Sequence, residues 1–297
     1  MRTSAGYLFM DYKKSSRSWP EHLSTLEKQG LILSSSDPHY FSLVSFHRLS
    51  PYFAVFYLLN DSQFTQNTTF AEIWQLYEFD RGLRLLLSDA IERIEVAFRT
   101  TLSESMCNEY GAHWFMQEAL FKNAAAHQRF LKKAAEVCQD KRDEELKHYY
   151  SRYHNPHLPP SWVLIEKLSF GTCSNLFRSL KFTQDKKKIS QLFGYHPTLI
   201  ASWIDAVRYT RNLCAHHARV WNRWFVTIPI LPQPFIEYKN QERRFIAQAL
   251  IIVTLLNKLL PHNNWKEQLF ALFERYPNTP FTQMGFSKDW KEDKFWF

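Results

Sequence analysis

A long helical repeat runs from Thr69 to about Met106. Apolar residues recur there every three or four positions, which is the period of one face of an α-helix. Thr69 and Glu72 have the spacing of a capping box, so the helix is predicted to begin beside them. Only 7 of the 297 residues are glycine, whereas a sheet protein with many tight turns would need more. The sequence therefore predicts an all-α fold.

The two faces of this helix differ in composition. Glu95 and Arg99 stand four residues apart, in the order that favours an ion pair along a helix. Either the polar face is an ordinary salt-bridged surface, or Glu92, Glu95 and Arg99 border a functional site as supporting groups. The polar face consists of Arg81, Arg84, Ser88, Glu92, Glu95 and Arg99. The apolar face, which we expect to be buried, consists of Leu83, Leu86, Leu87, Ala90, Ile91, Ile94 and Phe98.

Shorter helices are predicted before and after the repeat. Gly30 follows a helical stretch over 19–29, in the position of a glycine that ends a helix. Pro51 is expected to separate two short helices within 39–59. Further helices are predicted over 121–138, over 161–180 with a possible break at Gly171, from Pro197 onward, and over 245–260.

The length allows one large domain or two modest ones. We expect an N-terminal helical extension over 1–65 and a helical domain over 66–275. Residues 276–297 form a short, aromatic-rich and weakly ordered C-terminal tail in this prediction.

The chain is basic, with a net charge of +8 and a pI near 9.2. Polyanions such as nucleic acid or an anionic membrane are therefore plausible partners, although basic charge also serves solubility alone. A membrane is the weaker of the two predictions, because no continuous basic amphipathic helix with a wide apolar face is present. The longest apolar stretch, 245–260, is short for a bilayer span and is expected to be a buried core helix.

The cysteines indicate a reducing compartment. They are widely separated and follow no C-x-x-C spacing, so isolated thiols are expected instead of disulfides or a zinc site. No secretory signal is recognised at the N-terminus, and we expect a cytoplasmic protein. The four cysteines are Cys107, Cys138, Cys173 and Cys214.

Residues 202–224, SWIDAVRYTRNLCAHHARVWNRW, concentrate polar and basic side chains on one helical face. If this segment is one helix, a stripe about 80° wide presents a carboxylate, an amide, an imidazole and three guanidinium groups. The stripe consists of Asp205, Arg208, Asn212, His216, Arg219 and Arg223. The opposite, core-facing side consists of Trp203, Val207, Cys214 and Trp221.

Arg211 and His217 lie outside this stripe. Arg211 lies on its flank, about 140° around an ideal helix from His216, so a long arginine reach or a second copy of the helix would have to bring them together. His217 falls nearer the apolar face and is expected to be a buried structural histidine. Either His216 or His217 remains a candidate for proton transfer.

The segment Arg211-Asn212-Leu213-Cys214-Ala215-His216 matches the Arg-polar-x3-His signature of HEPN ribonucleases. The wider stretch, RNLCAHHARVWNR, resembles the AbiD/AbiF-type abortive infection family of bacteria. Three other segments resemble that family in order and spacing, so the resemblance covers most of residues 40–225. They are FHRLSPY (46–52), TFAEIWQLYEFDRGLRLLLSDAIERIEVAFRT (69–100) and WVLIEKLSFGT (162–172).

The resemblance implies a HEPN-type helical bundle, here with additional N-terminal helices, that dimerises and cuts RNA at the dimer groove. It also implies phage defence, in some cases as a toxin restrained by an antitoxin that is a small structured RNA or a protein. Catalysis would need no metal and no other cofactor.

The chemistry expected of these residues starts from the 2′-OH, a nucleophile that RNA itself carries. His216 is the candidate general base or acid, and Arg211 would stabilise charge on the phosphoryl oxygens. Asn212 would orient the imidazole or hold the phosphate. The products would be a 2′,3′-cyclic phosphate and a 5′-OH.

Two further possibilities accompany this hypothesis. Arg208, Arg219 and Arg223 are expected to contact the RNA backbone, although ordinary surface charges would look the same in the sequence. The alternative function is a non-catalytic HEPN protein that binds RNA or regulates a partner and is indifferent to the loss of His216.

Overall fold

The computed structural model describes residues 15–59, 61–293 and 296. The chain divides into two compact units, residues 1–78 and 79–297. The regular elements of the described residues are helices, accompanied by isolated β-bridges and no sheet, so the predicted all-α class is confirmed.

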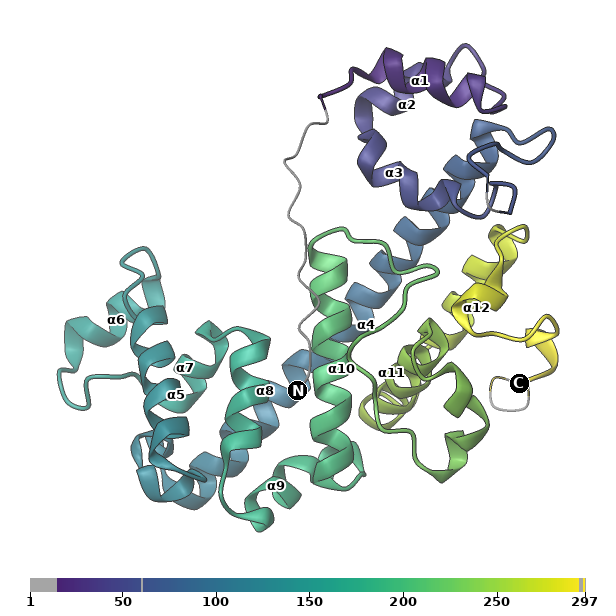
Figure 1. Ribbon diagram of the computed structural model, residues 1–297. Helices are drawn as coiled ribbons and strands as arrows, with labels where there is room; N and C mark the ends of the chain where they lie inside the picture. The colour runs from purple at the N-terminus through teal and green to yellow at the C-terminus, as the bar shows by residue number, and fades with distance from the viewer. Residues whose placement is uncertain (1–14, 60, 294–295, 297) are drawn as a thin grey trace, which may run out of the picture. The chain divides into compact units, whose positions relative to one another are not determined.

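Figure 1 labels the α-helices. In chain order they are α1 (Trp19–Lys28), α2 (Asp37–Leu43), α3 (Phe46–Phe53), α4 (Phe70–Tyr110), α5 (Ala124–Val137), α6 (Glu144–Arg152), α7 (Ser161–Lys167), α8 (Phe170–Ser179), α9 (Thr183–Ser190), α10 (Pro197–Ala215), α11 (Phe245–Leu259) and α12 (Trp265–Arg275). Short 3₁₀ helices occupy Trp114–Met116, Glu118–Leu120, Gln191–Phe193, Gln233–Gln241, Phe281–Met284 and Trp290–Glu292.

The first unit packs aromatic side chains between helices α1 to α3 and the first turns of α4. Phe41, Phe53 and Phe70 are buried there, and the ring centroids of Phe41 and Phe70 lie 4.8 Å apart. Gly30 follows α1 with a φ of +92°. This left-handed conformation ends many helices and suits glycine, so the predicted end of α1 is confirmed.

The bend predicted at Pro51 lies elsewhere. Helix α3 contains Pro51, and the chain turns instead between α2 and α3, at Val44 and Ser45. Pro51 has no N–H to donate to the carbonyl of His47. That carbonyl accepts the Ser50 hydroxyl at 3.2 Å, which satisfies it without a break in the helix.

Helix α4 begins where its sequence predicts. The Thr69 N–H donates to the Glu72 carboxylate at 2.8 Å, and the Glu72 N–H donates to the Thr69 hydroxyl at 3.4 Å. Arg84 and Arg99, predicted on the polar face, are only 6% and 7% exposed, because both form ion pairs inside the protein. The apolar face is buried as predicted except at Leu86, which is half-buried. Its buried residues are Leu83, Leu87, Ala90, Ile91, Ile94 and Phe98.

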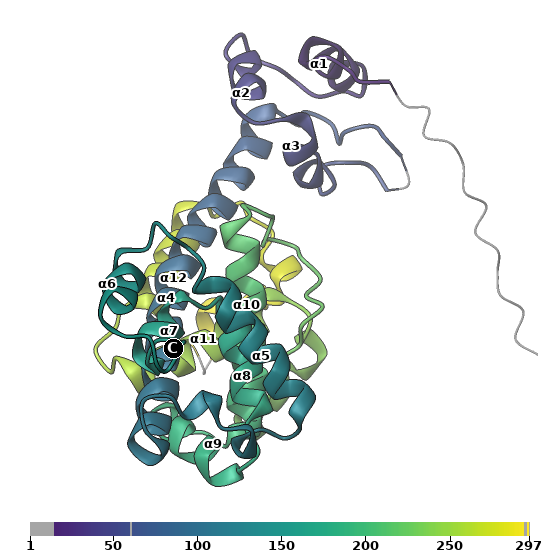
Figure 2. The same ribbon diagram turned by 90° about the vertical axis from the view of Figure 1, so that its left-hand side faces the viewer.

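In the second unit, α10 contacts α8, α9 and α11 (Figures 1 and 2). Trp203 and Val207 of α10 are fully buried, so their predicted core-facing position is confirmed. Helix α11 is the apolar stretch over 245–260, and most of its side chains are buried, as expected of a core helix. Within the described ranges, no helix combines the length and apolar character that a membrane crossing requires.

The helical stretch over 161–180 is interrupted at Leu168, before the predicted position at Gly171. The Ser169 hydroxyl accepts the Thr172 N–H at 3.1 Å and so caps α8. Gly171 lies in the first turn of α8, where an added Cβ would stand 3.4 Å from the Cδ of Arg208. That distance is an ordinary van der Waals contact with the Arg208 side chain.

Described residues of the predicted C-terminal tail pack against α12, where the sequence predicts weak order. Phe281 stacks on Phe273 with ring centroids 4.2 Å apart, and Trp290 stacks on Phe270 at 4.9 Å. Trp296 is fully buried. Helix α12 itself is an element that the sequence patterns do not predict.

Candidate active site at the end of helix α10

Helix α10 ends at Ala215, directly before the two adjacent histidines. His216 is the C-cap residue, and His217 has a φ of +52°. The N–H groups of His217 and Ala218 donate to carbonyls in the last turn at 3.0 and 2.8 Å, the bond pair of a Schellman motif. The prediction of one helix over 202–224 is therefore wrong beyond Ala215.

The chain beyond α10 is held by Asp80 of α4. The Asp80 carboxylate accepts the backbone N–H groups of Val220 at 3.1 Å and Trp221 at 2.6 Å. It also forms an ion pair with Arg84, one turn along the same helix. Because Asp80 and Trp221 are fully buried, this buried clamp fixes the segment that follows the two histidines.

Arg211 lies in an open hollow between α4 and the end of α10. The hollow has a volume of about 420 Å³, and its lining includes the carboxylates of Glu92, Glu95 and Glu166. The Nε atom of Arg211 lies 3.6 Å from Oε2 of Glu95, and 48% of the Arg211 side chain is exposed. A guanidinium group has five N–H donors, so this contact leaves donors for a ligand that approaches from solvent.

Glu95 is positioned by Arg99. The Nε atom of Arg99 donates to Oε1 of Glu95 at 3.1 Å, and the predicted ion pair is confirmed. Arg99 also donates to the carbonyls of Ile165 at 2.5 Å and Leu168 at 2.9 Å, at the end of α7. The buried Arg99 thus ties α4 to α7 and fixes the carboxylate that faces Arg211.

Arg211 and His216 of a single chain do not line the same hollow. Five residues separate them, which is about 7.5 Å along a helix and about 140° around it. Arg211 lines the hollow together with Ala215, whereas His216 is not part of the lining. The His216 side chain is exposed, and its backbone N–H donates to the carbonyl of the half-buried Asn212 at 3.0 Å.

His217 does not occupy the buried position expected of it. Its side chain is exposed, and its left-handed backbone removes it from the helical face on which the prediction rested. Histidine is among the residues that adopt this conformation more readily than bulky ones. Exposure alone therefore does not separate the two histidines as candidates for proton transfer.

The arginines expected to contact RNA lie in different settings. Arg208 belongs to α10, with its Nε atom 3.8 Å from Oδ1 of Asp205. Arg219 and Arg223 lie beyond the end of α10, so they do not share its stripe. The guanidinium of Arg219 lies 6.0 Å from the ring centroid of Trp221, and Arg223 donates to the Arg219 carbonyl at 2.6 Å.

Asp205 of α10 connects this helix to α8. It accepts the Ser174 hydroxyl at 2.7 Å and pairs with Arg178 at 2.6 Å. Only 13% of its side chain is exposed. The stripe that α10 presents is consequently reduced to Arg208, Asn212 and the C-cap His216.

The cysteines near the site are poor nucleophiles. Burial raises the pKa of Cys214 to about 12, and it raises the pKa of Cys173 to about 12 as well. Thiols with such pKa values stay protonated near neutral pH, whereas the thiolate is the reactive form. All four cysteines are free, as predicted. In the part of the chain that the structure describes, no three His, Cys, Asp or Glu side chains gather as a metal-binding group.

The sequence patterns single out neither Asp80 nor Glu166 as a contributor to the site. Asp80 and Arg84 have the i,i+4 spacing of a helical ion pair, so the pair itself was detectable, but its contact with Val220 depends on the tertiary fold. Glu166 reaches the Arg211 hollow only through the placement of α7. No sequence spacing indicates that placement.

These features define an all-α protein with an arginine in an open hollow and an exposed histidine at the end of one helix. A model of the family described as Abi-like protein matches residues 39–222, more than half of the chain. The chain therefore belongs to the Abi-like protein family, and this membership indicates a role in abortive infection, a form of phage defence. Comparisons with curated proteins and with solved structures find no match.

Proposed function

We propose that the protein is a metal-independent RNA endonuclease of the HEPN type that acts in phage defence as a homodimer. The observation that carries this proposal is the family match, which extends across Arg211, Asn212 and His216. The exposure of the Arg211 guanidinium and of the His216 imidazole supports it, since both groups are accessible to a large substrate.

In the proposed reaction, the 2′-oxygen of RNA attacks the adjacent phosphorus while the bond to the 5′-oxygen breaks. One base removes the 2′-OH proton, and one acid protonates the departing 5′-oxygen. Arg211 stabilises the additional negative charge on the phosphoryl oxygens. The products are a 2′,3′-cyclic phosphate and a 5′-OH, and the protons balance without a metal or another cofactor.

A second copy of the chain supplies what one copy lacks. The reaction needs a base and an acid, and each chain offers one His216. Within one chain Arg211 and His216 do not line the same hollow. In the proposed dimer, two copies of α10 lie side by side and bring the arginine of one to the histidine of the other. We therefore propose that the site forms between protomers.

The electrostatics of the Arg211 hollow restrict how RNA enters. Three carboxylates and two guanidinium groups line it, so a phosphate inside the hollow would meet net negative charge. The scissile phosphate is therefore expected on the exposed outer side of Arg211. Glu95 and Arg99 would position that arginine from behind, and they would not touch the substrate.

An accessible ribonuclease also needs restraint in the cell that makes it. We propose an antitoxin, either a small structured RNA or a protein, that covers the end of α10 until infection. Because the proposed substrate is RNA, we expect the protein to act in the cytoplasm.

The test is cleavage of end-labelled single-stranded RNA in EDTA by the wild type, by His216→Ala and by His262→Ala. His262 is an exposed histidine in the loop after α11 and serves as the matched control. The proposal expects cleavage by the wild type and by His262→Ala, and a loss of at least about 100-fold in His216→Ala, the usual weight of a general acid or base. Equal cleavage by all three proteins would contradict it.

A different result would favour the alternative, a non-catalytic RNA-binding or regulatory HEPN protein. Tight RNA binding without cleavage, in protein stripped of co-purified nucleic acid, would support that function. Under it, His216→Ala would leave RNA binding unchanged.

A further inference from the structure

A basic surface lies on α5, α8 and α9, apart from the hollow that holds Arg211. Two neighbouring hollows of about 640 and 480 Å³ share the side chains of Lys122 and Arg178. Glu136 is the one carboxylate in their combined lining. We call these hollows the basic surface; its cations are Lys122, Arg129, Lys132, Lys133, Arg178 and Lys186.

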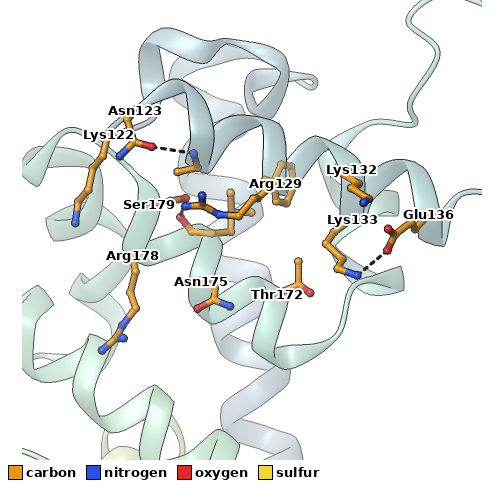
Figure 3. Close-up of a pocket in the computed structure, with 13 residues that line it drawn as sticks. Lys122, Asn123, Arg129, Lys132, Lys133, Glu136, Thr172, Asn175, Arg178 and Ser179 are labelled. Atoms are coloured by element: carbon orange, nitrogen blue, oxygen red, sulfur yellow. Dashed lines mark hydrogen bonds and ion pairs between the residues drawn. The ribbon is translucent and has the colours of Figure 1, made fainter.

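The larger hollow combines cations with neutral hydrogen-bonding groups over an apolar floor. Figure 3 shows Arg129 of α5 above Thr172 and Asn175 of α8. Phe130 and Leu176, which are 6% and 1% exposed, form the floor. Lysine, arginine, hydroxyl and amide groups are the side chains that contact phosphate and sugar in nucleic-acid complexes.

Three of the six cations of this surface are directed to solvent, whereas Lys133 and Arg178 pair with carboxylates. Lys133 pairs with Glu136 at 2.7 Å, as Figure 3 shows at one end of the hollow. The side chains of Lys122, Arg129 and Lys132 are exposed. An array of this kind attracts a polyanion more strongly than a single small anion, because each additional phosphate meets another cation.

The backbone fixes Lys122 where the two hollows meet. Its N–H donates to the Ser179 carbonyl at 2.9 Å, next to the end of α8. Lys186 of α9 lies close enough that its pKa is lowered to about 8, first by burial and then by the charge of Lys122. The other basic groups that face Lys186 are Arg178 of α8 and His196 before α10. An anion beside Lys122 and Lys186 would relieve the repulsion between these two lysines.

The basic surface is connected to the candidate active site through α10. Arg178 pairs with Asp205 of α10 at 2.6 Å. Arg208 lies one turn further along α10, and Arg211 lies six residues beyond Asp205, about 9 Å along the helix. Arg211 also lies about 120° around an ideal helix from Asp205, so a strand bound at the basic surface would pass Arg208 and follow the surface of α10 round to Arg211.

We propose that the basic surface binds the sugar–phosphate backbone of the RNA that is cut at Arg211 and His216, an inference that rests on the proposed function. The basic surface supplies affinity for RNA, which the carboxylates around Arg211 do not supply. It takes up a part of the RNA distant from the bond that is cut, and because its contacts are to phosphates, it is indifferent to sequence.

The experiment measures RNA binding separately from cleavage. All proteins carry His216→Ala, and the fluorescence anisotropy of a labelled 20-nucleotide RNA gives Kd at several salt concentrations. The test variant is Lys122→Gln/Arg129→Gln/Lys132→Gln. The control removes the same charge at exposed lysines elsewhere, as Lys28→Gln/Lys239→Gln/Lys291→Gln.

The test variant is expected to raise Kd at least about tenfold and to reduce the slope of log K against log salt by about 2, from roughly 0.7 per lost phosphate contact. The control is expected to change Kd much less. Lys122→Arg/Lys132→Arg keeps the charge and is expected to bind like the parent, which separates charge from folding.

Equal Kd values and slopes in the test and control variants would overturn the proposal, as would the absence of RNA binding by the parent. This failure differs from failure of the proposed function. Loss of the nuclease alone would appear as wild-type protein that binds RNA through these cations but does not cut it.

Discussion

Asp80→Asn is expected to destabilise the protein strongly although it changes one atom. The Asp80 carboxylate accepts two backbone N–H groups, from Val220 at 3.1 Å and Trp221 at 2.6 Å, and pairs with Arg84. Each hydrogen bond to a charged group contributes about 1.5–3 kcal/mol. Breaking a buried ion pair costs about 3–5 kcal/mol.

An asparagine keeps one acceptor oxygen for the backbone but loses the charge that Arg84 faces. We therefore expect the free energy of unfolding to fall by about 3 kcal/mol, a large share of a typical 5–15 kcal/mol. The assay is urea unfolding followed by circular dichroism, with the midpoint compared at constant slope.

Asp89→Asn is the matched control for this prediction. Asp89 and Arg93 form the same i,i+4 pair on the same helix at 2.9 Å, but their side chains are 48% and 46% exposed. Exposed pairs of this kind contribute about 0.3–0.5 kcal/mol. A difference of less than about 1 kcal/mol between the two variants would refute the assignment of Asp80 as a buried clamp.

Three other predictions concern packing, the shared site and pH. Gly285→Ala should lower the free energy of unfolding by about 1–3 kcal/mol more than Gly111→Ala in the same urea assay. Both glycines have positive φ, but an added Cβ at Gly285 would lie 2.7 Å from the Ile246 side chain, whereas at Gly111 it would meet nothing within 4 Å. Mixing inactive Arg211→Ala and His216→Ala subunits should restore part of the cleavage rate through hybrid dimers, and mixtures as inactive as the separate variants would count against a shared site. RNA affinity should weaken between pH 7 and 9, because the pKa of Lys186 is about 8 and its positive charge is lost above that pH. Lys186→Arg should remove this part of the pH dependence. If the same pH dependence persists in Lys186→Arg, another group is responsible.

The helices of this protein were largely predictable from local patterns. The apolar repeat of α4, the capping box at Thr69 and the glycine after α1 are each set by residues within a few positions of one another, and the structure has all three. The core position of Trp203 followed from the same periodicity. These predictions succeed because local sequence decides them.

The end of α10 could not be predicted in this way. The periodicity of 202–224 continues past Ala215, but the chain leaves the helix there and is fixed by Asp80, more than one hundred residues earlier. Arg99 was likewise placed on a polar face, whereas its contacts with the carbonyls of Ile165 and Leu168 bury it. Periodicity predicts which residues share a helical face, but it does not predict which polar side chains form buried contacts.

The central claim is that the 2′-OH of RNA is the nucleophile in a reaction that needs no metal. The most direct measurement compares three oligonucleotides of one sequence, as RNA, 2′-O-methyl RNA and DNA, in EDTA, with analysis of the product ends. We predict cleavage of the RNA alone, with 2′,3′-cyclic phosphate and 5′-OH ends, and its loss in His216→Ala. Cleavage of the DNA or of the 2′-O-methyl strand, or products that end in a 3′-OH, would contradict the mechanism.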